Sequence, residues 1–368
     1  MVMVATYTGK FKSISIYWYI SVYFSEKPNM TNAFYEDILA QPDVLRGLIE
    51  HHFVTDPKPL RSSAAPSRPL LTGMGASYHA AWITSYHLVS KGIVPLVQEA
   101  ADLVFYTQPM LDAVDACVFV SQSGRSAEVQ PVVKRLGEQV RLTGVTNEPD
   151  SPLGQAADQL LWLAAGDEKY VAAKTYMNSL AVLWLLARQW SDGLREADAD
   201  TLKGVADRIA GIISQAEATT ARWIDQLDGV DHLLFVGHGP HAATARQSAM
   251  MLNEWTKVSA FSASIGAYLH GFIESSGPEL GAVVYAPPGI TSESALAVAE
   301  RLQRHGAKVL VVANGQTLAV GERVSGGVDE YLSPMLDVVA AQLFAEAYAR
   351  HRGVEPGFRY LTKVVTQI

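Results

Sequence analysis

Short apolar and β-branched runs alternate along the chain with longer segments in which apolar residues recur at helical spacing. From residue 68 onward this alternation is typical of βαβ units around a parallel sheet. The first region predicts strands at 69–72, 93–98, 116–121, 141–146 and 160–164. It also predicts helices at 76–90, 126–139 and 174–190. The expected fold class is therefore α/β, with a parallel sheet flanked by helices.

A second region repeats the order of strand, glycine turn and helix. The strand predicted at 232–236 runs into Gly237-His238-Gly239 and a helix from about 241 to 255, as the first strand runs into Gly73-Met74-Gly75. Further strands at 283–286 and 308–313 and helices at 292–305 and 336–350 continue the alternation. We interpret this repetition as an internal duplication that produces two tandem three-layer αβα domains.

The pattern also predicts how the chain is divided. Residues 13–24 form an aromatic and β-branched run that is too short for a spanning helix and has no good signal cleavage site. We therefore expect residues 1–29 to be a disordered or non-native lead, with Met30 opening the folded protein. The other expected segments are a helical segment at 30–67, a first domain at 68–195, a helical connection at 196–228, a second domain at 229–355 and a C-terminal tail at 356–368.

Charge and cysteine content exclude several classes of protein. The formal net charge of -8 leaves no basic stripe that could neutralise a nucleic-acid backbone. The single cysteine, Cys117, lies in an apolar run, which excludes a disulfide framework and a cysteine-based zinc site. His51-His52 and the pair His238 and His241 have no carboxylate or thiol at matching spacing, so we expect no metal and no cofactor. We expect a cytoplasmic protein without nucleic-acid or membrane partners.

A serine-rich loop is the first candidate for chemistry. Ser121-Gln122-Ser123-Gly124-Arg125-Ser126 stands where a predicted strand gives way to a helix, so hydroxyls and backbone N–H groups could hold an anion there. Such a turn is also a common helix cap. However, Gly75-Ala76-Ser77 ends a neighbouring strand, and open α/β sheets bind ligands beyond the carboxyl ends of their strands. The corresponding turn of the second region, Ala286-Pro287-Pro288-Gly289, has prolines that donate no N–H, so we predict one phosphate site per chain.

Three segments, 73–77, 121–126 and 166–174, carry a resemblance to a known family. In order and spacing they are similar to successive motifs of the double sugar-isomerase (SIS) family, which includes the isomerase half of glucosamine-6-phosphate synthase. The similarity runs from about residue 30 to 368 and includes Asn253-Glu254 and the segments 266–271 and 361–366. The resemblance implies two tandem SIS domains, a sugar 6-phosphate as substrate, and a homodimer with a shared active site.

The resemblance also implies roles for individual residues. The 6-phosphate would be bound by Ser77, Ser121, Gln122, Ser123 and Ser126. Gly75, Val171 and Ala172 would contact the sugar. Three residues would be catalytic: Glu254 would shuttle the proton, His270 would open the ring from the neighbouring subunit, and Lys363 in the tail would meet the sugar carbonyl.

These residue types also suit the chemistry independently of the family. Moving a proton between C1 and C2 of an open-chain sugar needs a base whose pKa burial can raise toward neutrality, and Glu254 is such a candidate. Ring opening needs a group that can take and return a proton near pH 7, and histidine is the residue type suited to this task, which makes His270 the candidate. Lys363 could form a Schiff base or supply positive charge. Taken singly, the three could equally be a solvated glutamate, a core histidine and a surface lysine on a loose tail.

Several positions depart from the family pattern. Met251 stands where the synthase has a lysine, Ala267 replaces an acidic residue, and Gly271-Phe272 replaces Gly-Pro. These departures weaken the inference that this chain catalyses the synthase reaction more than they weaken the inference that it binds a sugar phosphate. A glutaminase domain needs an N-terminal cysteine nucleophile, and Cys117 lies inside a predicted strand, so we expect no glutaminase domain and no use of glutamine as the ammonia source.

The sequence therefore favours a phosphosugar isomerase or deaminase, with hydrolytic deamination of glucosamine 6-phosphate to fructose 6-phosphate and ammonia as the leading case. Deglycation of a fructosamine 6-phosphate and simple ketose/aldose isomerisation remain open alternatives. A non-catalytic sugar-phosphate-binding regulator is an alternative of another class. Such a regulator would keep the serine loop and lose the acid/base residues, so the joint presence of Glu254, His270 and Lys363 argues against it.

Overall fold

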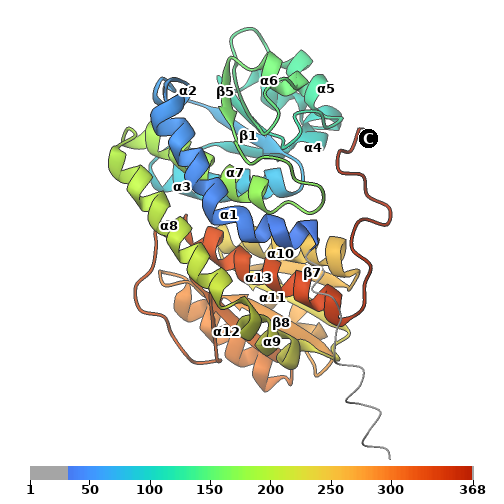
Figure 1. The fold of residues 1–368 in the computed structure, drawn as a ribbon. Helices are drawn as coiled ribbons and strands as arrows, with labels where there is room; N and C mark the ends of the chain where they lie inside the picture. Colours follow the sequence, from blue (N-terminus) through green and yellow to red (C-terminus); the bar gives the residue numbers. More distant parts are fainter. Residues whose placement is uncertain (1–31, 367–368) are drawn as a thin grey trace, which may run out of the picture. The chain divides into compact units, whose positions relative to one another are not determined.

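Two five-stranded sheets lie on either side of a shared layer of helices (Figure 1). This computed structural model describes residues 32–366, so the lead expected at residues 1–29 lies outside the described residues. The shared layer consists of α1 (Ala33–Glu50), α3 (Ala76–Ser90), α7 (Lys174–Ser191), α10 (Pro240–Thr256) and α13 (Ser333–His351). One continuous hydrophobic core contains residues of both sheets and of these helices.

The first sheet is entirely parallel. Its strand order is β2 (Leu96–Glu99), β1 (Pro69–Gly73), β3 (Ala116–Val120), β4 (Arg141–Thr146) and β5 (Gln159–Trp162). Successive side chains on a strand point to opposite faces, so Val118 enters the shared core while Cys117 and Phe119 enter an outer core. Because both faces are buried, the strand is a continuous apolar run, as the sequence pattern predicts.

Short helices cover the outer face of the first sheet. These are α4 (Ala100–Phe105), the 3-10 helix η2 (Gln108–Asp112), α5 (Val129–Arg135) and α6 (Pro152–Ala156). The predicted helix at 126–139 is wrong at both ends. The chain first makes a turn closed by the Val129 N–H and the Ser126 carbonyl oxygen, and it becomes extended at Leu136.

The second sheet has the same strand order and is mostly parallel. Its order is β7 (Ala260–Ser264), β6 (His232–Gly237), β8 (Leu280–Tyr285), β9 (Lys308–Ala313) and β10 (Gln316–Leu318). The last strand, β10, runs antiparallel to β9, whereas β5 runs parallel to β4. In both sheets a glycine of positive φ, Gly75 and Gly239, precedes the helix that follows the first strand. The matching order supports the predicted duplication.

The outer face of the second sheet packs against α11 (Ile265–Leu269), the 3-10 helix η3 (Phe272–Ser275) and α12 (Ser292–Arg304). The predicted helical connection consists of two helices, α8 (Glu196–Ser214) and α9 (Ala216–Leu227), and α8 packs along α1. Along the chain, α1 is followed by a short π-helix, η1 (His51–Thr55), and by α2 (Lys58–Arg61), before β1 begins. None of the helices within residues 32–366 is long and apolar enough to cross a membrane.

The fold class is confirmed as α/β with two helix-flanked sheets. The sequence pattern does not predict β7 and β10, the outermost strands of the second sheet on either side. The proposed domain limits stay predictions. The continuous core shows that the two sheets are not packed as independent units, because their inner faces bury the same helices.

Candidate active site

The serine loop follows β3 and is held tightly. Ser121 is buried, and its hydroxyl oxygen lies 3.5 Å from that of Ser126 across the loop. The N–H of Gly124 donates to the Ser121 carbonyl oxygen at 3.0 Å. Gly124 has φ of +60°, and a Cβ there would lie 1.9 Å from the hydroxyl oxygen of Ser151. Only glycine fits this position, so the loop holds its hydroxyls in one compact turn.

The start of α5 changes the physical basis of the predicted anion site. The helix begins at Val129, three residues after Ser126, and has seven residues. Helix-end charge close to the serines is therefore a weaker contribution than the sequence suggests. The donors available next to the loop are its own N–H groups and hydroxyls, and the exposed guanidinium of Arg125.

The second predicted phosphate-binding segment, at Ser77, lies beside the serine loop at the carboxyl ends of the strands. Gly73 ends β1 and pairs with Val120, which ends β3. A Cβ at Gly73 would lie 2.7 Å from the Val120 carbonyl oxygen, so glycine permits this close approach. Ser77 follows in the first turn of α3, and its N–H donates to the Met74 carbonyl oxygen. The structure thus brings the two predicted phosphate-binding segments to the carboxyl ends of adjacent strands.

Glu254 lies in the last turn of α10 and is partly buried. Burial raises the pKa of its carboxyl group to about 7, against the lowering effect of the positive charges of Lys363 and Lys257. A carboxyl group with this pKa can both take and return a proton near neutral pH. Its helix packs against the Gly75 turn, where a Cβ would lie 3.7 Å from the sulfur of Met250.

The C-terminal tail connects the surroundings of Glu254 to the serine loop. The Lys363 ammonium donates to the Tyr170 carbonyl oxygen at 2.5 Å and to Glu168 Oε2 at 3.1 Å. Two residues further on, the Val365 carbonyl oxygen accepts from the Ala127 N–H at 3.0 Å. Figure 1 shows this segment, in red, running from the end of α13 back to the first sheet. Lys363 is thus brought together with Glu254 and the serine loop.

Glu168 is a functional candidate to which the sequence reasoning assigned no role. Its side chain is fully buried and accepts from the N–H groups of Ala173 and Thr175 and from the Thr175 hydroxyl, in addition to Lys363. Next to it, Lys174 pairs with Asp37 at 2.8 Å, and burial is the main cause that raises the pKa of Asp37. Charged residues inside the predicted motif at 166–174 were the signal available in the sequence.

The predicted sugar contacts lie in the segment between β5 and α7. Val171 is 1% exposed and packs in the shared core, so its side chain is directed into the protein interior. Ala172 is half-buried beside it, and Gly75 adopts φ of +51° before α3. The roles of these three residues stay predictions.

His270 stands apart from the other predicted catalytic residues within one chain. It directly follows α11, and its side chain is exposed. Among residues 32–366, no hydrogen bond, ion pair or ring contact links His270 to Glu254, Lys363 or the serine loop. Its action from a neighbouring subunit therefore stays a prediction.

The other histidines singled out by the sequence have structural partners. The His241 ring donates to Asp337 Oδ2 at 2.7 Å in the interior, and His238 pairs with the Ser294 hydroxyl at 2.9 Å. Cys117 is fully buried in β3, where burial raises the pKa of its thiol to about 12. A thiol with that pKa is protonated at neutral pH and is a poor nucleophile.

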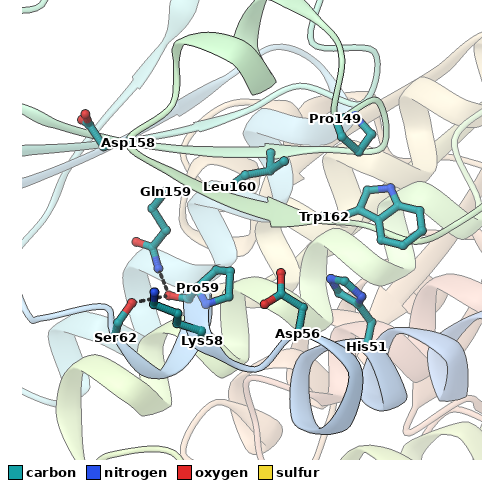
Figure 2. A pocket seen from close by; sticks show the side chains of 10 residues that line it. All are labelled: His51, Asp56, Lys58, Pro59, Ser62, Pro149, Asp158, Gln159, Leu160 and Trp162. Atoms are coloured by element: carbon teal, nitrogen blue, oxygen red, sulfur yellow. Dashed lines mark hydrogen bonds between the residues drawn. The ribbon is translucent and has the colours of Figure 1, made fainter.

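A pocket of about 450 Å³ lies elsewhere, between η1, α2 and the edge strand β5. Figure 2 shows that His51 and Trp162 lie side by side on one side of it and that Gln159 donates to the Pro59 carbonyl oxygen on the other. None of the predicted site residues lines this pocket. A smaller pocket of about 330 Å³ does reach the serine loop, and Arg125, Ser126 and Thr366 line it. Of the predicted site residues, Ser126 thus lines the smaller pocket and none lines the larger one.

A family model matches the part of the chain that contains the first sheet. Residues 64–188, which include the first sheet and both serine turns, match the model of the SIS domain. The chain therefore contains a SIS domain, and the resemblance drawn from the three sequence motifs is confirmed.

Individual proteins of known sequence and structure are also similar to this chain. The chain is 29% identical to a glutamine–fructose-6-phosphate aminotransferase [isomerizing] of Pyrococcus horikoshii, over 98% of this chain and 62% of that protein. It spans about three fifths of the length of the curated relatives that it matches. The C-terminal domain of glucosamine-fructose-6-phosphate aminotransferase from Francisella tularensis superposes with a TM-score of 0.76 at 17% identity, covering 89% of this chain and 99% of that one.

A glucosamine-6-phosphate deaminase from Thermotoga maritima superposes with a TM-score of 0.74 at 22% identity, covering 91% of this chain and 99% of that one. At such identities the likeness shows a shared fold. It leaves the reaction to be argued from the residues themselves.

Proposed function

We propose that this protein is a phosphosugar isomerase/deaminase that converts glucosamine 6-phosphate and water to fructose 6-phosphate and ammonia. One observation carries the proposal: Glu254, with its pKa raised to about 7, is under the charge of the tail lysine Lys363, and the same tail binds Ala127, the residue directly after the serine loop. A base, a cation and an anion-binding loop are the groups that an isomerisation of a sugar phosphate needs.

In the first step, the serine loop and Ser77 hold the 6-phosphate through hydroxyls and backbone N–H groups. Hydrogen bonds to a charged phosphate are each worth about 1.5 to 3 kcal/mol, so this end of the sugar supplies the anchoring. His270 of a second copy of the chain opens the ring in the proposed homodimer. The open-chain aldehyde then lies toward Glu254 and Lys363.

In the second step, Glu254 removes the proton from C2 and returns it to C1, while a proton passes from the amine nitrogen to the aldehyde oxygen, which becomes the C1 hydroxyl. This shift turns the aminoaldose into a ketose that carries an imine at C2. Water then adds to the imine carbon and the C–N bond breaks, which releases ammonia and leaves fructose 6-phosphate. The Lys363 ammonium stabilises negative charge that develops on the sugar oxygen during the proton shift.

Two observations support deamination over the synthase reaction. Met251, one turn before Glu254, is fully buried and apolar. Among the similar structures, a protein named as a glucosamine-6-phosphate deaminase shares this fold over nearly its whole length.

The proposal is tested by replacing the base. Glu254→Gln should lower turnover by about 100- to 10,000-fold, while sugar-phosphate affinity changes little, because the phosphate anchor is intact. The measurement couples detection of ammonia to detection of fructose 6-phosphate over a panel of amino-sugar and fructosamine phosphates. Glu217→Gln, on the exposed surface of α9, is the matched control and should keep full activity.

The pH profile gives a second measurement of the same residue. Because the base must be ionised, kcat/KM of the wild-type protein should fall about tenfold per unit below a pKa near 7. Release of ammonia by Glu254→Gln at the wild-type rate would contradict the assignment. Tight binding of sugar phosphates by a wild-type protein that turns none of them over would instead identify a non-catalytic regulator.

A further inference from the structure

The end of α10 contains a strained lysine next to the proposed base. Lys257 follows the last turn of the helix with φ of +58° and ψ of 18°, a left-handed conformation that residues with a Cβ disfavour. Strain of this kind persists only where surrounding contacts compensate for it. The contacts of the Lys257 side chain are therefore informative.

The Lys257 ammonium joins the helix end to the beginning of the tail. It donates to the backbone carbonyl oxygen of Glu254, one turn earlier, and to the carbonyl oxygen of Gly357 at 2.8 Å. Gly357 itself has φ of +111°, and a Cβ there would lie 3.5 Å from the ring of Tyr170. The side chain thus bridges two segments that are 100 residues apart.

Aromatic contacts surround the same point. The Tyr170 ring lies 5.7 Å from the ring of Phe358, which follows Gly357, and 5.7 Å from the ring of Trp255 in α10. The carbonyl oxygen of Tyr170 also accepts from Lys363. Tyr170 therefore contacts the tail at both ends, and Lys257, directly after α10, supplies a cationic contact to the beginning of the tail.

Charged side chains of both signs surround this point. Glu254 faces Lys363 from the tail and Lys257 from the end of its own helix. Lys257 in turn faces Glu254 and Arg359, and burial and Arg359 lower its pKa. Met251, on the preceding turn, is buried and contributes no charge. Lys257 is thus one of the cations beside the proposed base.

We propose that Lys257 is a positioning residue: it holds the beginning of the C-terminal tail on the end of α10 and supplies positive charge beside Glu254. The inference rests on the proposed function for its effect on turnover. The anchoring of the tail can be measured without any substrate.

The first experiment measures hydrogen–deuterium exchange of residues 355–366 in the full chain. Lys257→Met should raise exchange there about tenfold or more, and Lys257→Arg should restore most of the protection. Lys257→Gly relieves the left-handed strain, so its melting temperature should be no lower than that of the wild type while tail exchange still rises. Lys203→Met, an exposed lysine on α8, is the matched control.

The second experiment measures the effect on the base. Without the positive charge of Lys257 the pKa of Glu254 rises, so more of it is protonated at a given pH. Between pH 8 and pH 6, kcat/KM of the wild-type protein declines. Over the same interval, kcat/KM of Lys257→Met should decline by a factor that is about threefold or more larger. The same shift should be visible without substrate, as a higher titration midpoint of the Glu254 carboxyl carbon in an NMR titration.

The outcomes separate the two proposals. Wild-type tail exchange in both Lys257→Met and Lys257→Gly, or an unchanged Glu254 midpoint, would overturn the role of Lys257. If no sugar phosphate is turned over by the wild-type protein, the proposed function fails, while the exchange and NMR measurements still decide the positioning role. A rise in tail exchange that Lys257→Arg does not reduce would also refute it, since arginine keeps both charge and donors.

Discussion

Acid should destabilise this protein through three buried histidines. His52, His79 and His87 are each at most 2% exposed, and burial lowers the pKa of each ring to about 4. The unfolded chain binds a proton at these sites near pH 6.5, whereas the folded chain does so near pH 4. Stability from the neutral rings is therefore present above pH 6.5 and is lost as the pH falls toward 4.

The magnitude follows from these values. Between pH 7 and pH 5, each histidine costs about 2 kcal/mol of unfolding free energy, or roughly 5 to 6 kcal/mol for the three. Glu254 acts in the opposite direction, because its pKa is raised to about 7 in the folded state. Protonating it stabilises the fold by about 2 kcal/mol over the same interval, and the raised pKa of Asp37 acts in the same sense. The net loss should be roughly 3 kcal/mol.

The assay is urea unfolding at pH 7, 6 and 5, with the free energy of unfolding compared at constant ionic strength. His87→Phe is the informative variant, because the His87 ring lies 4.7 Å from the Tyr331 ring at an interplanar angle of 8°, and phenylalanine keeps that stacking. The variant should reduce the histidine contribution by about one third and leave stability at pH 7 nearly unchanged. A wild-type protein equally stable at pH 7 and pH 5, or an unchanged pH slope in His87→Phe, would refute the reasoning.

Two further predictions concern the serine loop and the second sheet. Gly124→Ala should weaken binding of glucosamine 6-phosphate about tenfold or more by calorimetry, because the added Cβ would meet Ser151. The control is Gly137→Ala, whose Cβ would meet nothing within 4 Å and which should bind normally. Equal affinities of the two variants would show that binding does not need the loop geometry. Asp337→Ala should lower the unfolding free energy by about 3 kcal/mol or more in urea, because it leaves the buried donors of His241 and Gly315 without their acceptor. The control is the exposed ion pair of Arg46 and Asp207, where Asp207→Ala should lower the unfolding free energy by under about 1 kcal/mol.

The sequence by itself determined the local elements and the residues that carry chemistry. Buried parallel strands such as β3 are recognisable because both faces enter a core, which makes the run continuously apolar. Glycine turns before α3 and α10 are recognisable because the chain there requires a positive φ. The strand β7 is missed because it lies at the sheet edge and carries serines at alternate positions, so it has no apolar run.

Only the tertiary structure decided how these residues act on one another. The pKa of Glu254 depends on burial and on Lys363, which is more than 100 positions away in the sequence. The bridges of Lys257 to Gly357 and of Ala127 to Val365 likewise join segments that no local pattern relates. Desolvation and Coulomb interactions depend on distance in space, and distance in space between distant segments is set by the packing of the shared helix layer.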